Sequence, residues 1–297
     1  MAAYITGIII FSLIAVIATV GLAIFTGFTG LFSLGHAAFF AIGAYTAGIL
    51  TYFYDVNFFL ALFAGGLMSG FVGLFIGVPT LKAKLRSDYF AIATLGFGEA
   101  VRVLLENLNI TQGARGLPGI TAATTLPVAF AVAALVIWIA RNFVRSRHGR
   151  AAIAVREDFV AAEMMGINLF AVRLSSLVFS AVCCGVAGGL FAHYVCFIQP
   201  AMFTAYLSTQ LTAGVVAGGM GSITGPVVAA IIFVAVPEAL RVANIWRLVA
   251  YGLLLVLIMV FRPQGLFGYR ELSWKSFRHI PDWLKAWRKS GNRRAKL

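Results

Sequence analysis

Apolar runs long enough to cross a lipid bilayer dominate this chain. The first three occupy residues 4–25, 37–54 and 58–81, and a membrane-spanning helix needs about 20 apolar residues. Of the whole chain, 61% is hydrophobic and 11% is charged, whereas a soluble domain carries roughly 25% charged residues. The sequence therefore predicts an all-α, polytopic membrane protein and excludes a soluble fold.

The later apolar runs bring the expected total to about eight to ten membrane segments. One of them is interrupted by Glu99, Arg102 and Glu106. The first run has no Lys or Arg before it and is longer than the apolar core of a signal peptide, so we expect it to be retained as a span. The later runs are residues 89–108, 126–140, 174–198, 227–240 and 248–261.

Glycine follows two different patterns among the 31 glycines of the chain. Within residues 58–81, four glycines recur at steps of four, three and four, which places them on one helix face where another helix can approach closely. They are Gly66, Gly70, Gly73 and Gly77.

In two other places glycine interrupts an apolar run together with hydroxyl residues. Residues 27–36 contain Ser33, and residues 214–226 contain Ser222 and Thr224. Transporters use such broken helices to expose backbone groups to substrate, so these segments are candidates for a translocation path in two related halves. Ordinary helix ends with glycine caps are the alternative.

The positive charge clusters in loops and the tail. The chain has 23 Lys and Arg against 10 Asp and Glu, a net charge of +13, and the basic clusters lie at residues 82–88, 141–173 and 262–297. The positive-inside rule explains this distribution without a nucleic-acid partner. We expect the three clusters and the C-terminus on the cytoplasmic side and the N-terminus on the other, unless residues 27–36 form a re-entrant element.

Residues 141–173, the polar segment, carry six arginines and three acids between apolar runs. A segment of this composition must lie in water. Glu157 and Asp158 suit the start of a short helix, and Gly166 suits its end. Ala162 lies four residues before Gly166 on one flat face, which predicts a surface for another protein. A surface helix whose arginines hold lipid phosphates is the alternative.

We find no catalytic constellation in the sequence. The four histidines, His36, His148, His193 and His279, are far apart in the chain, and neither a zinc-protease motif nor a Walker A loop is present. We therefore expect a protein that is not an enzyme, has no cofactor and does not itself hydrolyse ATP through a P-loop.

Some polar residues in the apolar runs could serve either structure or transport. His36 either lies near a substrate path or bonds a neighbouring carbonyl to secure the break. Glu99 and Arg102 are three residues apart on one helix face, and charges at membrane depth tend to pair. They form either a structural ion pair or part of a gate. Glu238 and Arg241 have the same spacing, and the same two alternatives apply to them.

Several short motifs, in this order, resemble the permeases of branched-chain amino acid ABC importers, the LivM-like group. The resemblance covers most of residues 27–268. It is carried by GLFSLGHAAFFAIGAY at 30–45, DYFAIATLGFGE at 88–99, GR at 149–150, RED at 156–158, AA at 161–162, GGMGSITGP at 218–226 and FRPQGL at 261–266.

The resemblance implies an ABC importer permease fold in residues 1–268, followed by a basic cytoplasmic tail, residues 269–297. Such permeases dock on two cytoplasmic ATPase subunits through a coupling helix with the motif E-A-A-x-x-x-G. This chain has Val160 in place of the glutamate. The residues expected in this contact are Arg156, Glu157, Asp158, Ala161, Ala162, Glu163 and Gly166.

The resemblance also implies the other partners: a second homologous permease, a periplasmic binding protein and the lipid bilayer of a bacterial inner membrane. The implied cargo is a branched-chain or other neutral amino acid. An importer of urea or short amides is the alternative, and a secondary transporter coupled through Glu99 or Glu238 is less favoured. The candidate path residues are Ser33, His36, Glu99, Ser222 and Thr224.

Overall fold

The computed structural model describes residues 2–83 and 87–239, together with a few positions between 252 and 268. The apolar run 248–261 and the basic tail are therefore largely outside the described residues, as are Lys84, Arg86 and Arg241.

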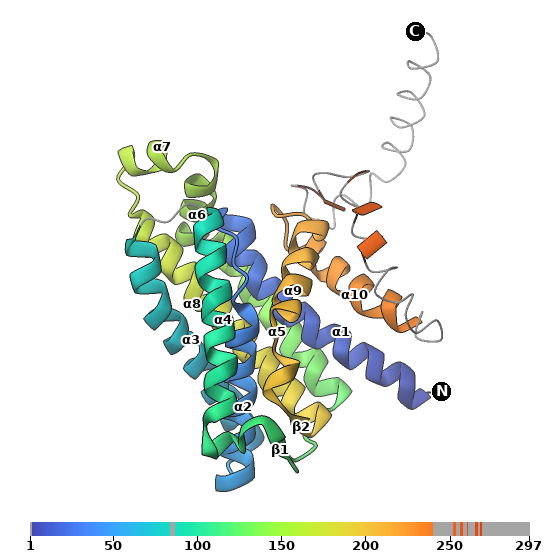
Figure 1. Cartoon of the computed structure of the whole chain (residues 1–297). Helices are drawn as coiled ribbons and strands as arrows, with labels where there is room; N and C mark the ends of the chain where they lie inside the picture. Colours follow the sequence, from blue (N-terminus) through green and yellow to red (C-terminus); the bar gives the residue numbers. More distant parts are fainter. Residues whose placement is uncertain are drawn as a thin grey trace, which may run out of the picture.

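The described chain is a helical bundle with two short helices at one end (Figure 1). The all-α prediction is confirmed, apart from two strands of two residues each. The bundle consists of α1 (Ala2–Leu22), α2 (His36–Tyr54), α3 (Phe58–Lys82), α4 (Ser87–Asn107), α5 (Leu126–Arg145), α8 (Leu169–Val195), α9 (Ala205–Gly218) and α10 (Thr224–Ala239), and the short helices are α6 (Arg147–Glu157) and α7 (Phe159–Met164).

Within the described ranges, five helices are long and apolar enough to cross a membrane: α1, α2, α3, α5 and α8. This makes the chain a multi-pass membrane protein. Helix α4 is of spanning length but carries charges, whereas α9 and α10 have only 14 and 16 residues. The expectation of about eight to ten membrane segments is larger than these five. It also counts helices such as α4, α9 and α10, which length and composition alone do not identify as spans.

The helices alternate in direction between two ends of the bundle. We call the end that holds α6 and α7 the polar end (Figure 1). Lys82, which ends α3, lies 6.0 Å from the ring of Phe170 in α8, so the described cation of the first basic cluster shares this end with residues 141–173, as predicted. At the opposite end, β1 (Leu117–Pro118) pairs antiparallel with β2 (Phe197–Ile198).

Helices α2, α3 and α8 pack with their backbones unusually close. The four glycines predicted to share a face of α3 all lie against α8: a Cβ on Gly70 would be 2.6 Å from Val182, and one on Gly73 would be 2.8 Å from Ala181. Gly185 of α8 lies directly against the backbone of Gly43 in α2 and the side chain of Ser69 in α3. Small residues let apolar helices associate in this way, and the predicted glycine face is confirmed.

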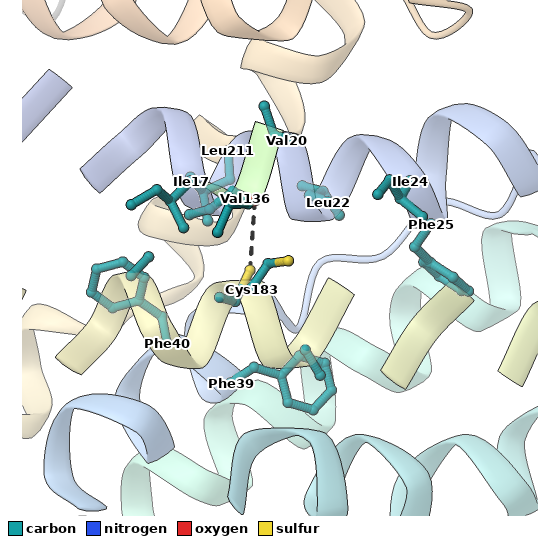
Figure 2. Close-up of a cluster of buried hydrophobic side chains, with 14 of the residues drawn as sticks. Ile17, Val20, Leu22, Ile24, Phe25, Phe39, Phe40, Val136, Cys183 and Leu211 are labelled. Carbon is teal, nitrogen blue, oxygen red and sulfur yellow. Dashed lines mark hydrogen bonds between the residues drawn. The ribbon is translucent and has the colours of Figure 1, made fainter. Parts of the chain in front are cut away.

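Helix α1 crosses the other side of α8 and is buried along most of its length. Figure 2 shows Ile17 and Val20 of α1 beside Cys183 of α8 and Leu211 of α9. Cys183 and Cys184 are buried free thiols and pack here as small apolar residues. This packing fixes α1, α9 and α8 around the region where the helices are interrupted.

Candidate functional site

Two helix breaks meet at the polar end. After α1 the chain forms a π-helix, Ala23–Gly27, and leaves the helix at Gly30, where φ is +75°. The other break follows α9 at Gly219, where φ is +115°. A Cβ on Gly27 would lie only 2.6 Å from the carbonyl oxygen of Met220. The two glycine-broken segments predicted from the sequence are therefore in direct contact.

A buried hydrogen-bond network holds the first break. The Ser33 hydroxyl lies 2.9 Å from Nδ1 of His36, and Nε2 of His36 lies 2.7 Å from the hydroxyl of Ser180 in α8. Thr212 of α9 donates to the carbonyl of Ser33 at 3.2 Å. Ser33 and His36 are fully buried. His36 thus secures the break, as one interpretation of the sequence held, but through hydroxyls rather than a carbonyl.

The second break is a capped helix end. The Ser222 hydroxyl accepts a hydrogen bond from the amide of Gly225 at 3.2 Å, at the start of α10, whose first residue is Thr224. The carbonyl of Ala217 in α9 accepts from the amide of Leu266 at 2.8 Å. Ser222 therefore stabilises local structure, which is what the alternative of ordinary helix ends predicted.

A cavity of about 570 Å³ lies between α1, α8, α9 and α10. Its wall is mainly apolar and aromatic, and its few polar groups include Gln210 and Glu238. The carboxylate of Glu238 accepts a hydrogen bond from the hydroxyl of Tyr4 at 3.1 Å. None of the path residues predicted from the sequence lines this cavity in the described part of the chain. Its wall residues are scattered through several apolar runs, and the sequence singled out one of them, Glu238, as a candidate gate or coupling acid.

Glu99 lies elsewhere, on a face of α4 that no other described helix covers fully. Nε of Arg102 donates to Glu99 at 2.8 Å, and Nη1 of the same arginine bonds Glu106. The three side chains are between 28% and 39% exposed. The predicted ion pair is confirmed, with Glu106 as a third member that gives the triad a formal charge of −1.

The polar segment forms two helices, although the sequence predicted one. The carboxylate of Asp158 accepts hydrogen bonds from the amides of Val160 and Ala161 at 2.9 and 3.0 Å, which caps α7. Gly166 follows with φ of +79°. The predicted start at Asp158 and end at Gly166 are therefore confirmed. Glu157 instead ends α6, a helix capped by Ser146 that was missed.

The outward face of α7 differs from the predicted one. Ala162 is only 4% exposed and packs into the chain, so it cannot form a flat contact surface with Gly166. The reason is that Gly166 has already left the helix, and the four-residue spacing no longer defines a common face. Ala161, Glu163 and Gly166 are exposed. The most exposed apolar residues are Met164 at 85% and Met165 at 82%.

The exposed apolar residues of α7 stand out because the composition of this segment predicts that it lies in water. Phe159 and Val160 are each 56% exposed beside the two methionines. On helices that face lipid such exposure is ordinary, but in a solvated polar segment a group of exposed apolar residues marks a site of contact with another protein or with the membrane surface. We call Phe159, Val160, Met164 and Met165 the α7 patch. The sequence signal for it was the run of large apolar residues around the two alanines.

Comparisons with known proteins agree on one family. The family model described as "Branched-chain amino acid transport system / permease component" matches residues 4–261. The chain is 35% identical over 290 residues to the high-affinity branched-chain amino acid transport system permease protein LivM of Escherichia coli (strain K12), covering 86% of this chain and 68% of that protein. No solved structure matches the chain.

Two further relatives broaden the comparison. LivM of Salmonella typhimurium is 34% identical over 290 residues, with 86% of this chain and 68% of that protein covered. A probable branched-chain amino acid transport permease protein LivH of Methanocaldococcus jannaschii is 25% identical over 305 residues, with 92% of this chain and 94% of that protein covered.

Proposed function

The chain belongs to the family of permease components of branched-chain amino acid transport systems, and we propose that it is one membrane-spanning subunit of an ATP-driven importer. In this proposal it moves branched-chain or other neutral amino acids across a bacterial inner membrane, with its C-terminus in the cytoplasm. It carries no Walker A loop, so two separate cytoplasmic ATPase subunits hydrolyse the ATP.

The α7 patch is the observation that carries the proposal. It presents two almost fully exposed methionines from a capped helix at the polar end, where the basic clusters predict the cytoplasmic side. Methionine is common at adaptable binding surfaces. We propose that an ATPase subunit covers this patch, which is bordered by Glu157, Asp158, Ala161, Glu163 and Gly166. Arg156 and Ala162 are largely buried, and we propose that they support the patch from inside the chain.

A second homologous permease is the partner we propose within the membrane. The chain is similar to proteins named LivM and to one named LivH. In addition, the triad of Glu99, Arg102 and Glu106 is partly exposed on α4, and charges that face lipid are costly. A partner subunit or a water-filled path beside α4 would remove that cost, and Glu99 would then border the path.

The cavity between α1, α8, α9 and α10 suits an aliphatic cargo. Its volume of about 570 Å³ and its largely apolar wall can hold a branched side chain out of water, as small-molecule sites commonly do. We propose that a periplasmic binding protein delivers the amino acid to this side of the bundle, and that Ser33, His36, Ser222 and Thr224 support the path by holding the breaks.

In this scheme ATP supplies the free energy that separates two states of the permease. A ligand shifts a conformational equilibrium only through its different affinity for the two states. ATP binding would close the ATPase pair, displace α6 and α7, and so favour one orientation of the bundle. A secondary transporter would instead need an acid that changes its charge along the path. Of the two candidates, Glu99 is paired with Arg102, and Glu238 lies in the cavity wall, bonded to Tyr4; a requirement of uptake for ATP distinguishes the two mechanisms.

The α7 patch is tested by placing charge on it. Met164→Asp with Met165→Asp should weaken ATPase binding at least about tenfold, because each buried methionine contributes about 1.5–3 kcal/mol of apolar contact. Co-purification of the complex and ATP-dependent leucine uptake into proteoliposomes measure this. Met164→Leu with Met165→Leu, which keeps the patch apolar, is the matched control. Full ATPase binding and uptake by the aspartate variant would refute the docking assignment.

The cargo is tested in the same proteoliposomes. Unlabelled leucine, isoleucine or valine should compete with labelled leucine in the presence of the binding protein, whereas urea and acetamide should not. Efficient competition by urea would favour the short-amide alternative.

A further inference from the structure

Arg156 differs from the other arginines at the start of the polar segment. Arg141, Arg145, Arg147 and Arg150 are exposed, as expected for solvated or lipid-phosphate contacts. The side chain of Arg156 is only 14% exposed and turns from the last turn of α6 toward the two helix breaks. Burying most of a guanidinium is costly unless its donors are satisfied.

The Arg156 guanidinium joins three separate parts of the chain. Its Nη1 donates to the carbonyl of Gly27, which ends the π-helix, at 2.9 Å, and reaches the carbonyl of Met220 in the second break at 3.5 Å. Its Nε and Nη2 donate to the carboxylate of Glu157 at 3.1 and 2.6 Å. Carbonyls at a helix end lack intrahelical donors, and a cation is favourable there.

The backbone around Arg156 leaves room for its side chain. Gly30 has φ of +75°, and a Cβ at that position would lie 3.1 Å from Cγ of Arg156. Gly27 itself lies against the Met220 carbonyl, so one guanidinium can reach both breaks. Arginine presents several donors in a fixed fork, whereas the lysine ammonium is a single point charge. The site therefore uses the specific geometry of arginine.

We infer that Arg156 is a positioning residue that ties both helix breaks to the polar segment, so that movement of α7 is passed to the breaks. Only Glu157 separates Arg156 from Asp158, the residue that caps α7. A displacement of α7 therefore reaches the carbonyls of Gly27 and Met220 through one short, charge-assisted connection. This inference rests on the proposed function, because it assigns the ATPase as the source of the movement.

The test measures coupling, which is the amount of leucine transported per ATP hydrolysed. The complete complex, with both permeases, the ATPases and the binding protein, is reconstituted with Arg156→Gln, Arg156→Lys or the control Arg150→Gln. Arg150 lies on the same helix but is exposed. We expect Arg156→Gln to retain ATPase binding and hydrolysis but to lower the coupling ratio about tenfold, while Arg150→Gln matches the wild type.

The Arg156→Lys variant provides a second test of the inference. Its single side-chain nitrogen can reach the two carbonyls that Nη1 contacts in arginine, but it lacks the fork that also binds Glu157, so its coupling ratio should lie between those of glutamine and wild type. If Arg156→Gln does not assemble, the ratio of Arg156→Lys decides. A wild-type ratio in every assembled Arg156 variant overturns the inference, and a loss of complex without a change in ratio indicates a structural role only. If the wild-type complex shows no ATP-dependent uptake, it is the proposed function that fails.

Discussion

The bundle contains two regions that use glycine differently. In the packed unit, formed by α2, α3 and α8, glycines sit inside continuous helices and let backbones touch. In the broken unit, formed by α1, α9 and α10, Gly218 and Gly225 also bring backbones together, but Gly30 and Gly219 take positive φ angles and end helices. Both units are equally apolar in composition, so the difference lies in where the glycines are placed and what lies opposite them.

This difference separates a rigid part of the molecule from a deformable one. Close backbone packing resists displacement, since interiors of native density transmit strain rather than absorb it. The broken unit instead contains a π-helix, two breaks and the large cavity. The buried hydroxyl of Thr26, within the π-helix, has no hydrogen-bond partner among the described residues. We therefore expect conformational change to occur in the broken unit, with the packed unit as its support.

The largest expected effect comes from adding one methyl group to the packed unit. In Gly188→Ala the new Cβ would overlap the main-chain carbonyl oxygen of Phe40 in α2. Because a backbone cannot swing aside as a side chain can, we expect a loss of about 3 kcal/mol or more. Thermal unfolding of the purified protein in detergent, followed by size-exclusion chromatography, measures it.

Gly96→Ala is the matched control for that substitution. Gly96 also lies inside a helix, α4, but nothing lies within 4 Å of the Cβ that alanine would add. Alanine is favoured over glycine in a helix interior by about 1 kcal/mol, so this variant should be as stable as the wild type or slightly more so. Equal stability of the two variants would mean that the packed unit is not rigid.

An intermediate effect is expected in the broken unit, and on transport rather than on folding. In Gly27→Ala the Cβ would lie 2.6 Å from the Met220 carbonyl and would push the breaks apart at a cost of about 1–2 kcal/mol. We expect normal amounts of folded complex but clearly reduced leucine uptake in proteoliposomes. If Gly27→Ala instead lowered the amount of folded complex and left uptake per folded complex normal, the broken unit would not be the deformable part of the molecule.

The smallest effect is expected at the link between the first break and the packed unit, where His36 contacts both Ser33 and Ser180. Ser180→Ala removes the hydroxyl that lies 2.7 Å from His36, leaving a fully buried imidazole nitrogen without that partner, at a cost of about 1 kcal/mol. Ser175→Ala, on the same helix, removes only a bond to the carbonyl of Val172 within the helix and serves as the control. Thermal unfolding should show that Ser180→Ala is less stable than Ser175→Ala. The opposite ranking would mean that the bond between Ser180 and His36 does not stabilise this link.

The comparison also explains which parts of the site could be predicted. The glycine face of α3 and the cap at Asp158 follow from spacing within one helix, and both predictions are confirmed. The prediction for Ala162 was wrong, because a helical spacing was extended to Gly166, which lies beyond the end of α7. For the path residues, the sequence indicated that Ser33 and His36 belong to a break but not that they bond Ser180 of α8.

The sequence by itself determined the membrane class, the helical architecture, the solvated polar segment and the positions of both breaks. These properties depend on hydrophobic runs and on local backbone preferences, which are read within about 20 residues. Only the tertiary structure decided that the breaks touch, that Arg156 reaches Gly27 and Met220, and that the α7 patch points outward. Those contacts join residues far apart in the chain, and they are set by which helix backbones can approach one another.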